Sequence, residues 1–427
     1  MADTFPANEL HTGVIRGSAS PKEYTVKYKG RDLKGEELCA QLDRWASNGT
    51  IERDTAESLK LVARNPTWTG LSDRYFVLLG ANAAMGPLHV LLALGANVIA
   101  VDIPFPAVWK AIITAARNSA GTLIFPLSVP FANVQHNDEQ LFAASGANLV
   151  ESCPEVARWL LQQAPGHQLT IGNYVYLDSA LFVRVSIACD AIMKKVCEKR
   201  SNTAIAFLCT PTDIHVVPEA THRAAARNCS GLRRLLFFPF ELSPIGKLRL
   251  RKNVQPPVKA ADGSLQFYVD GIVPDQGFNY AISKRMQHWR CVVARSLGHT
   301  TSSHIAPSTA TISVLKNRTF AWAYDGLPVV CPTIEIFMQE TSNSVMTGLL
   351  INDLCNPDSF ARADKPLRNP LELFSHNSFH GGVWTMPYTM ASTGAVSVIM
   401  HFVKLFRPLL FLFFLAFLWF VFQHLYA

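Results

Sequence analysis

The sequence lacks the patterns that mark several protein classes. None of its nine cysteines stands in a C-x-x-C spacing, which argues against a zinc ribbon and a thioredoxin-type redox site. No basic stretch followed by an apolar one opens the chain, so we predict no secretory signal. We therefore expect reduced, buried thiols in a cytosolic setting. Charged residues are only 17% of the chain and glycine and proline follow no period, which excludes a disordered or collagen-like protein.

The length and the charge set wider limits. A chain of 427 residues is long enough for two or three domains. Its net charge of +7 is small for this length and does not indicate nucleic-acid binding. Such a charge is compatible with an anionic membrane surface or a phosphorylated cofactor.

The last residues form the longest apolar run. Residues 409–422 read LLFLFFLAFLWFVF, in which the indole of Trp419 is the only polar side-chain group. A helix of this length rises only about 21 Å, but residues 405–427 can cross a hydrocarbon core of roughly 30 Å. We predict a single-pass membrane anchor, with the endoplasmic reticulum favoured, because Lys404 and Arg407 on its N-terminal side place the body in the cytosol. A re-entrant or interfacial helix and a buried core helix are the alternatives.

Upstream, apolar runs alternate with helical patterns. Continuous apolar stretches such as residues 75–79 and 98–101 are typical of parallel strands buried on both faces. Helical periodicity over residues 107–118 and 180–199 separates these and later runs. The alternation predicts an α/β fold, a Rossmann-like doubly wound parallel sheet, followed by the membrane helix.

The same pattern suggests a division of the chain. We expect a polar, partly helical leader, a nucleotide-binding domain with one insertion, an irregular substrate or cap region and the anchor. The corresponding ranges are 1–70, 71–315 with the insertion at about 213–278, 316–393 and 394–427.

A glycine-bounded turn follows the first predicted strand. In Gly80-Ala-Asn-Ala-Ala-Met-Gly86, glycines allow the backbone to approach a pyrophosphate at the start of a helix. Asp102 ends the next strand, where a carboxylate can accept hydrogen bonds from ribose hydroxyls and would repel a 2′-phosphate. The pattern favours NAD over NADP, although Ala84 replaces a middle glycine and a plain tight turn is the alternative.

A second pattern pairs a phenol with an amine. Tyr280 and Lys284 are four residues apart and so share one helical face. A nearby ammonium is expected to lower the phenol's pKa toward the working pH, which would suit proton transfer to a carbonyl or alcohol. An ordinary solvent-facing pair is the bland alternative.

Together these motifs resemble those of the short-chain dehydrogenase/reductase superfamily. The turn matches its T-G-x-x-x-G-x-G motif in register, Asp102 matches its acidic strand end, and Tyr280 and Lys284 match its Y-x-x-x-K pair. Ile305-Ala-Pro-Ser308 loosely matches its later I-x-P-G segment. The resemblance implies Tyr280, Lys284 and a hydroxyl residue in catalysis, and NAD(P) contacts from Gly80, Asn82, Met85, Gly86, Asp102, Lys284, Pro307 and Thr311.

The chain departs from the family at two points. Where the family places its catalytic serine, about thirteen residues before the tyrosine, this chain has Phe267. The substitutes are Ser264, or Thr210 and Thr212 after the preceding strand, and we choose Thr210. No N-N-A-G segment occurs, and Asn173 is the nearest approach.

The resulting hypothesis is a membrane-anchored, NAD(P)-dependent oxidoreductase acting on a carbonyl or secondary alcohol. The anchor and the aromatic second half suggest a lipophilic substrate drawn from the bilayer. The alternative is a non-catalytic membrane scaffold that holds a nucleotide. We expect membrane lipid as a partner, no nucleic acid and no metal, and the oligomeric state stays open.

Two weaker patterns each have an ordinary structural role as the alternative explanation. His376 and His380 are spaced like metal ligands, but no carboxylate follows at a familiar spacing. Residues 233–252 interleave basic and apolar side chains. This segment is either an ordinary solvated insertion or a patch that rests on anionic lipid.

Overall fold

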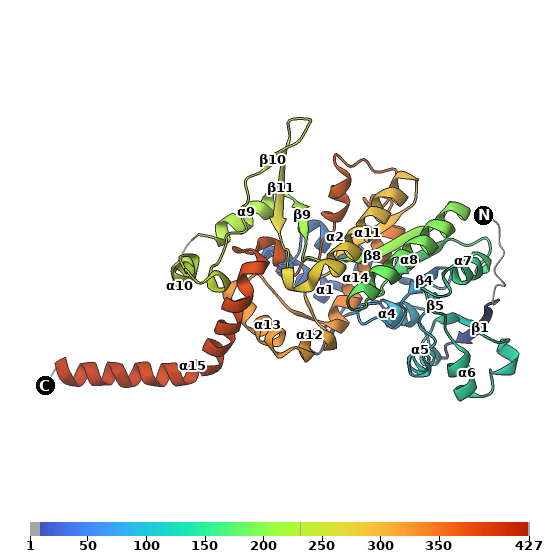
Figure 1. The fold of residues 1–427 in the computed structure, drawn as a ribbon, viewed down its shortest axis with the longest axis horizontal. Coiled ribbons are helices and arrows are strands. Elements are labelled where there is room, and N and C mark those ends of the chain that lie inside the picture. The colour runs from blue at the N-terminus through green and yellow to red at the C-terminus, as the bar shows by residue number, and fades with distance from the viewer. Residues whose placement is uncertain (1–8, 231, 426–427) are drawn as a thin grey trace.

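The structure, a computed structural model, describes residues 9–230 and 232–425, without the side chains of residues 232, 233, 313 and 408–425. Its centre is a seven-stranded sheet (Figure 1). The strands of this sheet are β1 (His11–Arg16), β4 (Tyr75–Leu79), β5 (Asn97–Val101), β6 (Thr122–Leu127), β7 (Leu169–Asn173), β8 (Ala204–Cys209) and β12 (Thr301–Ile305).

Six of these strands are parallel and follow the doubly wound order. The sheet order is β1-β6-β5-β4-β7-β8-β12. Starting from β4, the chain adds β5 and β6 on one side, then returns to add β7, β8 and β12 on the other. The order therefore reverses between β4 and β7, and ligands of such sheets bind where it reverses. The predicted α/β class with a mainly parallel sheet is confirmed.

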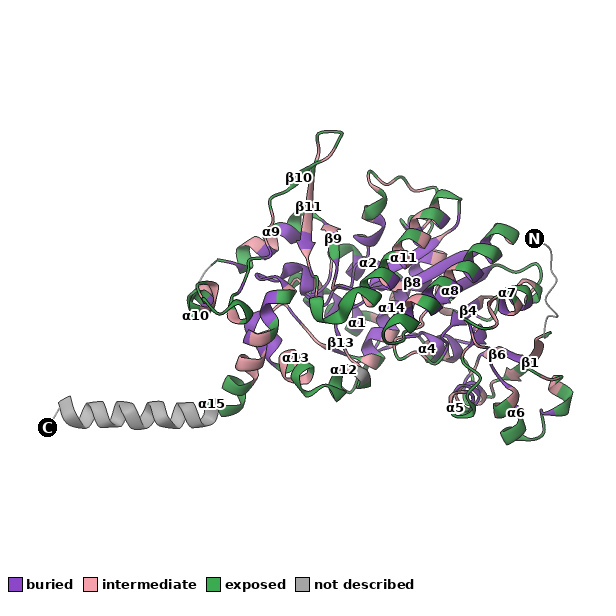
Figure 2. Cartoon of the chain, viewed as in Figure 1, coloured by how far each residue is buried: buried purple, intermediate pink, exposed green. Residues whose placement is uncertain are grey.

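Alternate side chains of the strands serve two cores. In β4, Phe76 and Leu78 belong to one buried cluster, and Val77 and Leu79 belong to the other. Helices cover both faces, so inner strands such as β4 and β8 are largely purple in Figure 2. This double burial explains why the strands appear as continuous apolar runs. The first face is covered by α4 (Leu88–Ala93), α5 (Pro106–Arg117) and α14 (Gln339–Cys355), and the second by α7 (Cys153–Gln162), α8 (Ala180–Lys199) and α11 (Gly277–Ser296).

Residues 9–70 are part of the body rather than a separate leader. β1 pairs antiparallel with β6 and extends the sheet, with His11 opposite Leu127. Trp45 is 1% exposed and hydrogen-bonds Glu335 through its indole at 2.9 Å. The other elements of this segment are β2 (Val26–Tyr28), β3 (Arg31–Leu33), α1 (Gly35–Ser47), α2 (Arg53–Arg64) and α3 (Pro66–Thr69).

The insertion leaves the sheet after β8 and returns at α11. It forms a small sheet of β9 (Ile214–Val217), β10 (Val258–Lys259) and β11 (Leu265–Asp270), with α9 (Glu219–Asn228) and α10 (Leu232–Glu241). Its place agrees with the predicted range of 213–278. The insertion also holds the 3-10 turns η2 (Gly246–Leu248) and η3 (Pro274–Gln276). Short elements elsewhere are α6 (Asp138–Ala144) and the 3-10 turns η1 (Phe131–Asn133), η4 (Pro370–Phe374) and η5 (Val383–Thr385).

The region expected to be a cap contains a core helix. α14 is buried along most of its length, although its sequence has no clear apolar face. Its Asp353 accepts a 2.5 Å hydrogen bond from His304 of β12 and another from Ser359. Burial alone would lower the pKa of His304, but the carboxylate of Asp353 raises it. The remaining elements are α12 (Ile312–Lys316), α13 (Arg318–Val330), β13 (Thr309–Ala310) and β14 (Phe337–Met338).

The last helix begins inside the body. α15 (Met390–Leu425) starts against α13, where Gly326 lies so close to the Ser397 carbonyl that a Cβ atom would collide with it. Val396 is fully buried. The boundary expected at residue 394 therefore cuts through a packed helix.

The predicted membrane anchor lies mainly in residues whose side chains the structure does not describe. In the part of the chain that the structure describes, no helix combines the length and the apolar character needed to cross a membrane. Residues 409–422, the core of the predicted anchor, lie outside the residues that are described with side chains.

Candidate functional site

A cleft opens at the carboxyl edge of the sheet, beside the point where the strand order reverses. Its volume is about 360 Å³. It is lined by the turn after β4, the ends of β7, β8 and β12, and α11. The lining includes Ala84, Met85, Asn173, Thr210, Tyr280, Lys284, Pro307, Ser308 and Thr311. The fold thus brings together residues that are more than two hundred positions apart.

Gly80 makes the turn after β4 possible. Its φ of +77° lies in the left-handed region, and a Cβ atom would lie 2.8 Å from Val175 Cγ1. At the other end of the turn, a Cβ atom on Gly86 would lie 3.1 Å from the Ala83 carbonyl oxygen. Both positions therefore favour glycine. The helix that follows, α4, has only six residues.

Asp102 lies beside this turn, as the sequence predicted. Its Oδ2 atom accepts a hydrogen bond from the Asn82 backbone N–H at 2.8 Å, and its Oδ1 atom accepts one from Ile103. Burial raises the pKa of this carboxyl, and the two N–H groups oppose that shift. The aspartate therefore fixes the turn, and each of its oxygens keeps a second lone pair for a ligand.

Tyr280 and Lys284 lie on the cleft side of α11. The ammonium of Lys284 is 5.9 Å from the centre of the Tyr280 ring. It donates hydrogen bonds to the Leu208 carbonyl oxygen at 3.0 Å and to Gln287 at 3.3 Å. Burial lowers the pKa of Lys284 to about 8.

The expected lowering of the phenol's pKa is wrong for this structure. Burial raises the pKa of Tyr280 to about 12, and the hydrogen bond with Thr210 offsets only part of that shift. Desolvation disfavours a phenolate, and the Lys284 ammonium is directed to a backbone carbonyl instead.

Thr210, the hydroxyl residue chosen in place of the family's serine, lies next to Tyr280. It follows β8, its hydroxyl contacts the Tyr280 phenol, and it lies 2.6 Å from the Thr212 hydroxyl. Thr212 in turn donates to Gln276 Oε1 at 2.6 Å. The other candidate, Ser264, lies on the insertion and donates to Asp262.

The segment after β12 closes the cleft. Thr309 donates its hydroxyl hydrogen to the Pro307 carbonyl oxygen at 2.9 Å, and the Thr311 N–H donates to the Thr309 carbonyl oxygen. Ser308 hydrogen-bonds the phenol of Tyr324, whose pKa is raised by burial.

Sequence reasoning missed three residues of this site. Tyr176, Gln276 and Tyr324 line the cleft but belong to no motif. Gln276 is four residues before Tyr280, a spacing that could have indicated it. No pattern in the sequence indicates Tyr324, which arrives from α13.

A second cavity adjoins the cleft and shares Tyr280 with it. Its volume is about 470 Å³. Its walls come from the insertion, α13 and the first turns of α15. Apolar lining residues are Val273, Val314, Phe320, Leu327, Met390 and Ala391. A molecule held here would reach the Tyr280 hydroxyl from the side of the last helix.

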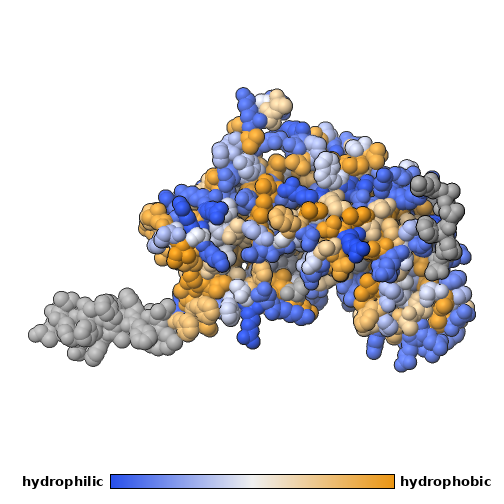
Figure 3. All heavy atoms as spheres, viewed as in Figure 1, coloured by the Kyte–Doolittle hydropathy of each residue, from blue (hydrophilic) through white to orange (hydrophobic). Residues whose placement is uncertain are grey.

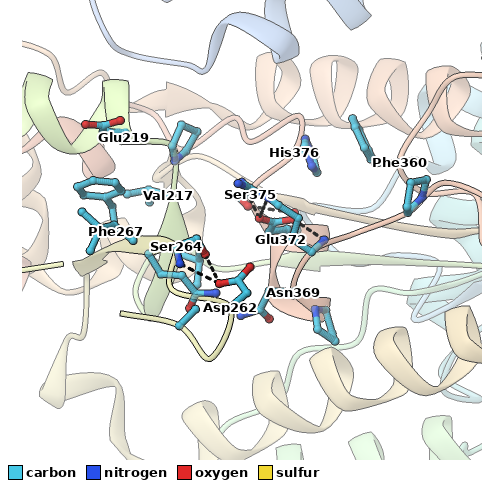
Figure 4. A pocket seen from close by; sticks show the side chains of 18 of the residues that line it. Val217, Glu219, Asp262, Ser264, Phe267, Phe360, Asn369, Glu372, Ser375 and His376 are labelled. Atoms are coloured by element: carbon cyan, nitrogen blue, oxygen red, sulfur yellow. Dashed lines mark hydrogen bonds and ion pairs between the residues drawn. The ribbon is translucent and has the colours of Figure 1, made fainter. Parts of the chain in front are cut away.

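A larger cavity, of about 900 Å³, lies between the insertion and residues 360–376 (Figure 4). The figure shows Asp262 turned toward Ser264 and Glu372 near Ser375. Asp262 accepts hydrogen bonds from Ser264, and Glu372 is paired with Arg368. Because these carboxylates are already engaged, we place the chemistry in the smaller cleft.

His376 and His380, which are spaced like metal ligands, each lie near a carboxylate of the N-terminal segment. His376 Nδ1 is 3.5 Å from Asp54, and His380 Nε2 is 3.2 Å from Glu52. Among the described residues, no group of three or more His, Cys, Asp or Glu side chains could hold a metal ion.

Comparison with protein-family models, curated proteins and solved structures found no match. The description of the site therefore rests on the residues of this chain and on the order of its strands.

The pKa of Lys284 leads to a prediction. Between pH about 8 and the usual lysine value of about 10.4, the unfolded chain binds a proton that the folded protein has released. The free energy of unfolding therefore gains a contribution that rises with pH across this interval. We expect chemical denaturation to show the wild type gaining stability over Lys284→Met in this interval. Lys195→Met, at an exposed position of α8, is the control and should show no such difference from the wild type. If the free energies of unfolding of Lys284→Met and the wild type change in parallel with pH, the prediction is contradicted.

Proposed function

We propose that the chain is an NAD(P)-dependent oxidoreductase of the short-chain dehydrogenase/reductase type. The observation that carries the proposal is the meeting of Thr210, Tyr280 and Lys284 in one cleft with the turn after β4. Thr210 follows β8, and Tyr280 and Lys284 both belong to α11. With the turn after β4 they line the edge of the sheet at which doubly wound folds bind nucleotides.

The residues around the cleft fit a dinucleotide. The turn that starts at Gly80 brings backbone to the edge of the cleft, as binding of a pyrophosphate requires. Asp102 lies beside that turn, in position for ribose hydroxyls, and favours NAD over NADP. Lys284, Pro307 and Thr311 lie at the far end of the cleft, where the nicotinamide half would bind. A bound nicotinamide would supply or accept the hydride.

The protein's own groups would handle the proton. Burial raises the pKa of Tyr280 to about 12, so the residue is a protonated phenol at neutral pH and its hydroxyl would be the proton donor to a carbonyl oxygen. The Thr210 hydroxyl would position that oxygen beside the phenol. Lys284 would supply positive charge as the phenolate forms, because an ammonium close to a phenolate stabilises it. These roles favour reduction of a carbonyl over oxidation of an alcohol, so reduction is the reaction to assay first.

A lipophilic substrate and a membrane location belong to the same proposal. The second cavity has apolar walls, and Met390, Ala391 and Gly394 of α15 form part of them. The same helix leads toward residues 409–422, whose sequence we propose as a membrane anchor with the body in the cytosol. A substrate dissolved in the bilayer would then have a short route to Tyr280.

The alternative is a non-catalytic scaffold that binds a nucleotide. The raised pKa of Tyr280 favours it, because a phenol of this kind is a weak base for oxidising an alcohol. Tight cofactor binding without turnover on sterols, retinoids or long-chain ketones would support this alternative.

The first prediction concerns the cofactor. Gly86→Asp adds a negative charge and a Cβ atom 3.1 Å from the Ala83 carbonyl oxygen. We expect it to abolish dinucleotide binding, measured by fluorescence titration with NADH and NADPH. The matched control is Gly70→Asp, which adds the same side chain at an exposed position with φ −78°. Unchanged affinity in a folded Gly86→Asp protein would refute the cofactor site.

The second prediction concerns the proton donor. Tyr280→Phe keeps the aromatic ring and removes the hydroxyl. Turnover should fall by about 10²–10⁴-fold while NADH affinity stays within a few-fold. Tyr268→Phe, on β11, should leave both unchanged. Activity of Tyr280→Phe close to that of the wild type would remove this tyrosine from the mechanism.

The third prediction concerns the tail. We expect the full chain to resist carbonate extraction from membranes, because the side chains of residues 409–422 are almost wholly apolar. Truncation after Arg407 should release a folded body, since it spares the buried Val396. Truncation before Gly394 should damage folding, because it removes packed residues. Full-length protein that washes off in high salt would argue against an anchor.

A further inference from the structure

The outer face of α10 and the segment that follows it are apolar and exposed to solvent. Leu235 is 69% exposed, Leu236 71% and Leu242 67%, with Phe238 and Ile245 also exposed. We call these five residues the α10 surface. Figure 3 shows hydrophobic atoms gathered at the end of the molecule where α10 and the start of α15 lie. Exposed apolar groups at this density are typical of a contact surface.

The opposite face of α10 holds the helix in place. Phe237 is 4% exposed and packs in a cluster with Tyr388 and Val396, at the start of α15. The Tyr388 hydroxyl donates to Glu241 at 2.9 Å. The helix is therefore packed against the body on one side, and its apolar outer side is exposed even so.

Basic residues surround this surface. Residues 233–252 contain six arginines and lysines and one acidic residue. The acidic residue, Glu241, is neutralised by Arg234 at 3.2 Å. Lys247, Arg249 and Arg251 are exposed. An apolar face bordered by exposed positive charge matches the interface of an anionic bilayer.

Further exposed apolar residues continue the surface along α15. Leu405 is 60% exposed and Phe406 48%, just before the apolar sequence at residues 409–422. The 470 Å³ cavity is also walled by the first turns of α15. The α10 surface, the exposed part of α15 and one wall of the cavity thus belong to the same end of the body.

We propose that the α10 surface binds the interface of an anionic membrane, with its leucines in the lipid and Lys247 and Arg249 at the headgroups. This contact is separate from the apolar tail and does not depend on the redox reaction. A second copy of the chain fits less well, because a symmetric contact through this face would bring like charges together. The contact holds the cavity end of the body against the bilayer.

The experiment places a reporter on the surface of the full chain. Leu236→Cys is labelled with an environment-sensitive fluorophore, which is selective because the native cysteines are buried or half-buried. Vesicles are made of phosphatidylcholine alone or mixed with phosphatidylserine, with nitroxide-labelled lipid as quencher. We expect a blue shift and lipid quenching that are larger with phosphatidylserine. The matched control, Leu265→Cys on the insertion hairpin, is 57% exposed and should show neither.

Charge reversal tests the electrostatic part. Lys247→Glu with Arg249→Glu should weaken the response to phosphatidylserine vesicles about tenfold or more. Lys110→Glu with Lys195→Glu reverses two exposed charges on other helices and should leave it unchanged.

Two results would overturn the proposal. The first is that the fluorescence of the label at position 236 does not shift while the protein is bound to vesicles. This result would show that the tail alone makes the attachment. Alternatively, the label shifts without lipid as protein concentration rises, which would identify the surface as a contact between copies. Neither result bears on cofactor binding, so the proposed reaction is tested separately.

Discussion

Six parallel strands that end at one edge of a sheet are the constraint on which the site depends. The order reverses between β4 and β7, so the segments after these two strands separate and leave room between them. Met85, Asn173 and Thr210 reach the same cleft because each follows a strand of this sheet. Tyr280 and Lys284 join them from α11, which packs beside β8 and β12. The chemistry of the cleft is thus a consequence of strand order.

The sequence predicted the regular part of this arrangement well. The run at β4 and the helix α8 have the expected bounds, because burial on both faces or a long apolar stripe leaves a clear pattern. Tyr280, Lys284 and Asp102 were found from local spacing alone. β1 and α14 were not recognised as parts of the core, since a short edge strand and a helix with buried polar groups show no such pattern. Their places are decided by distant partners, such as His304 for Asp353.

Burial explains why the electrostatics of the site differ from the expectation. Spacing on a helix shows that two side chains share a face, but not how much water reaches them. In this cleft desolvation raises the pKa of Tyr280 and lowers the pKa of Lys284, and so favours the neutral form of each side chain. The phenol holds its proton more tightly and the amine less tightly than in water. Each group therefore stays neutral over a wider pH range than it would in water, and a bound charged ligand would alter that balance.

The last helix starts packed in the body and bends where it leaves the body (Figure 1). Ser397 of α15 is fixed against Gly326, and the helix continues without a break through the exposed Phe406. With a rise of about 1.5 Å per residue, the number of residues between these points sets their separation. Each added residue would also rotate everything beyond it by about 100°. The register of the packed part of α15 therefore fixes where Phe406 lies relative to the cavity wall that the first turns of the helix form.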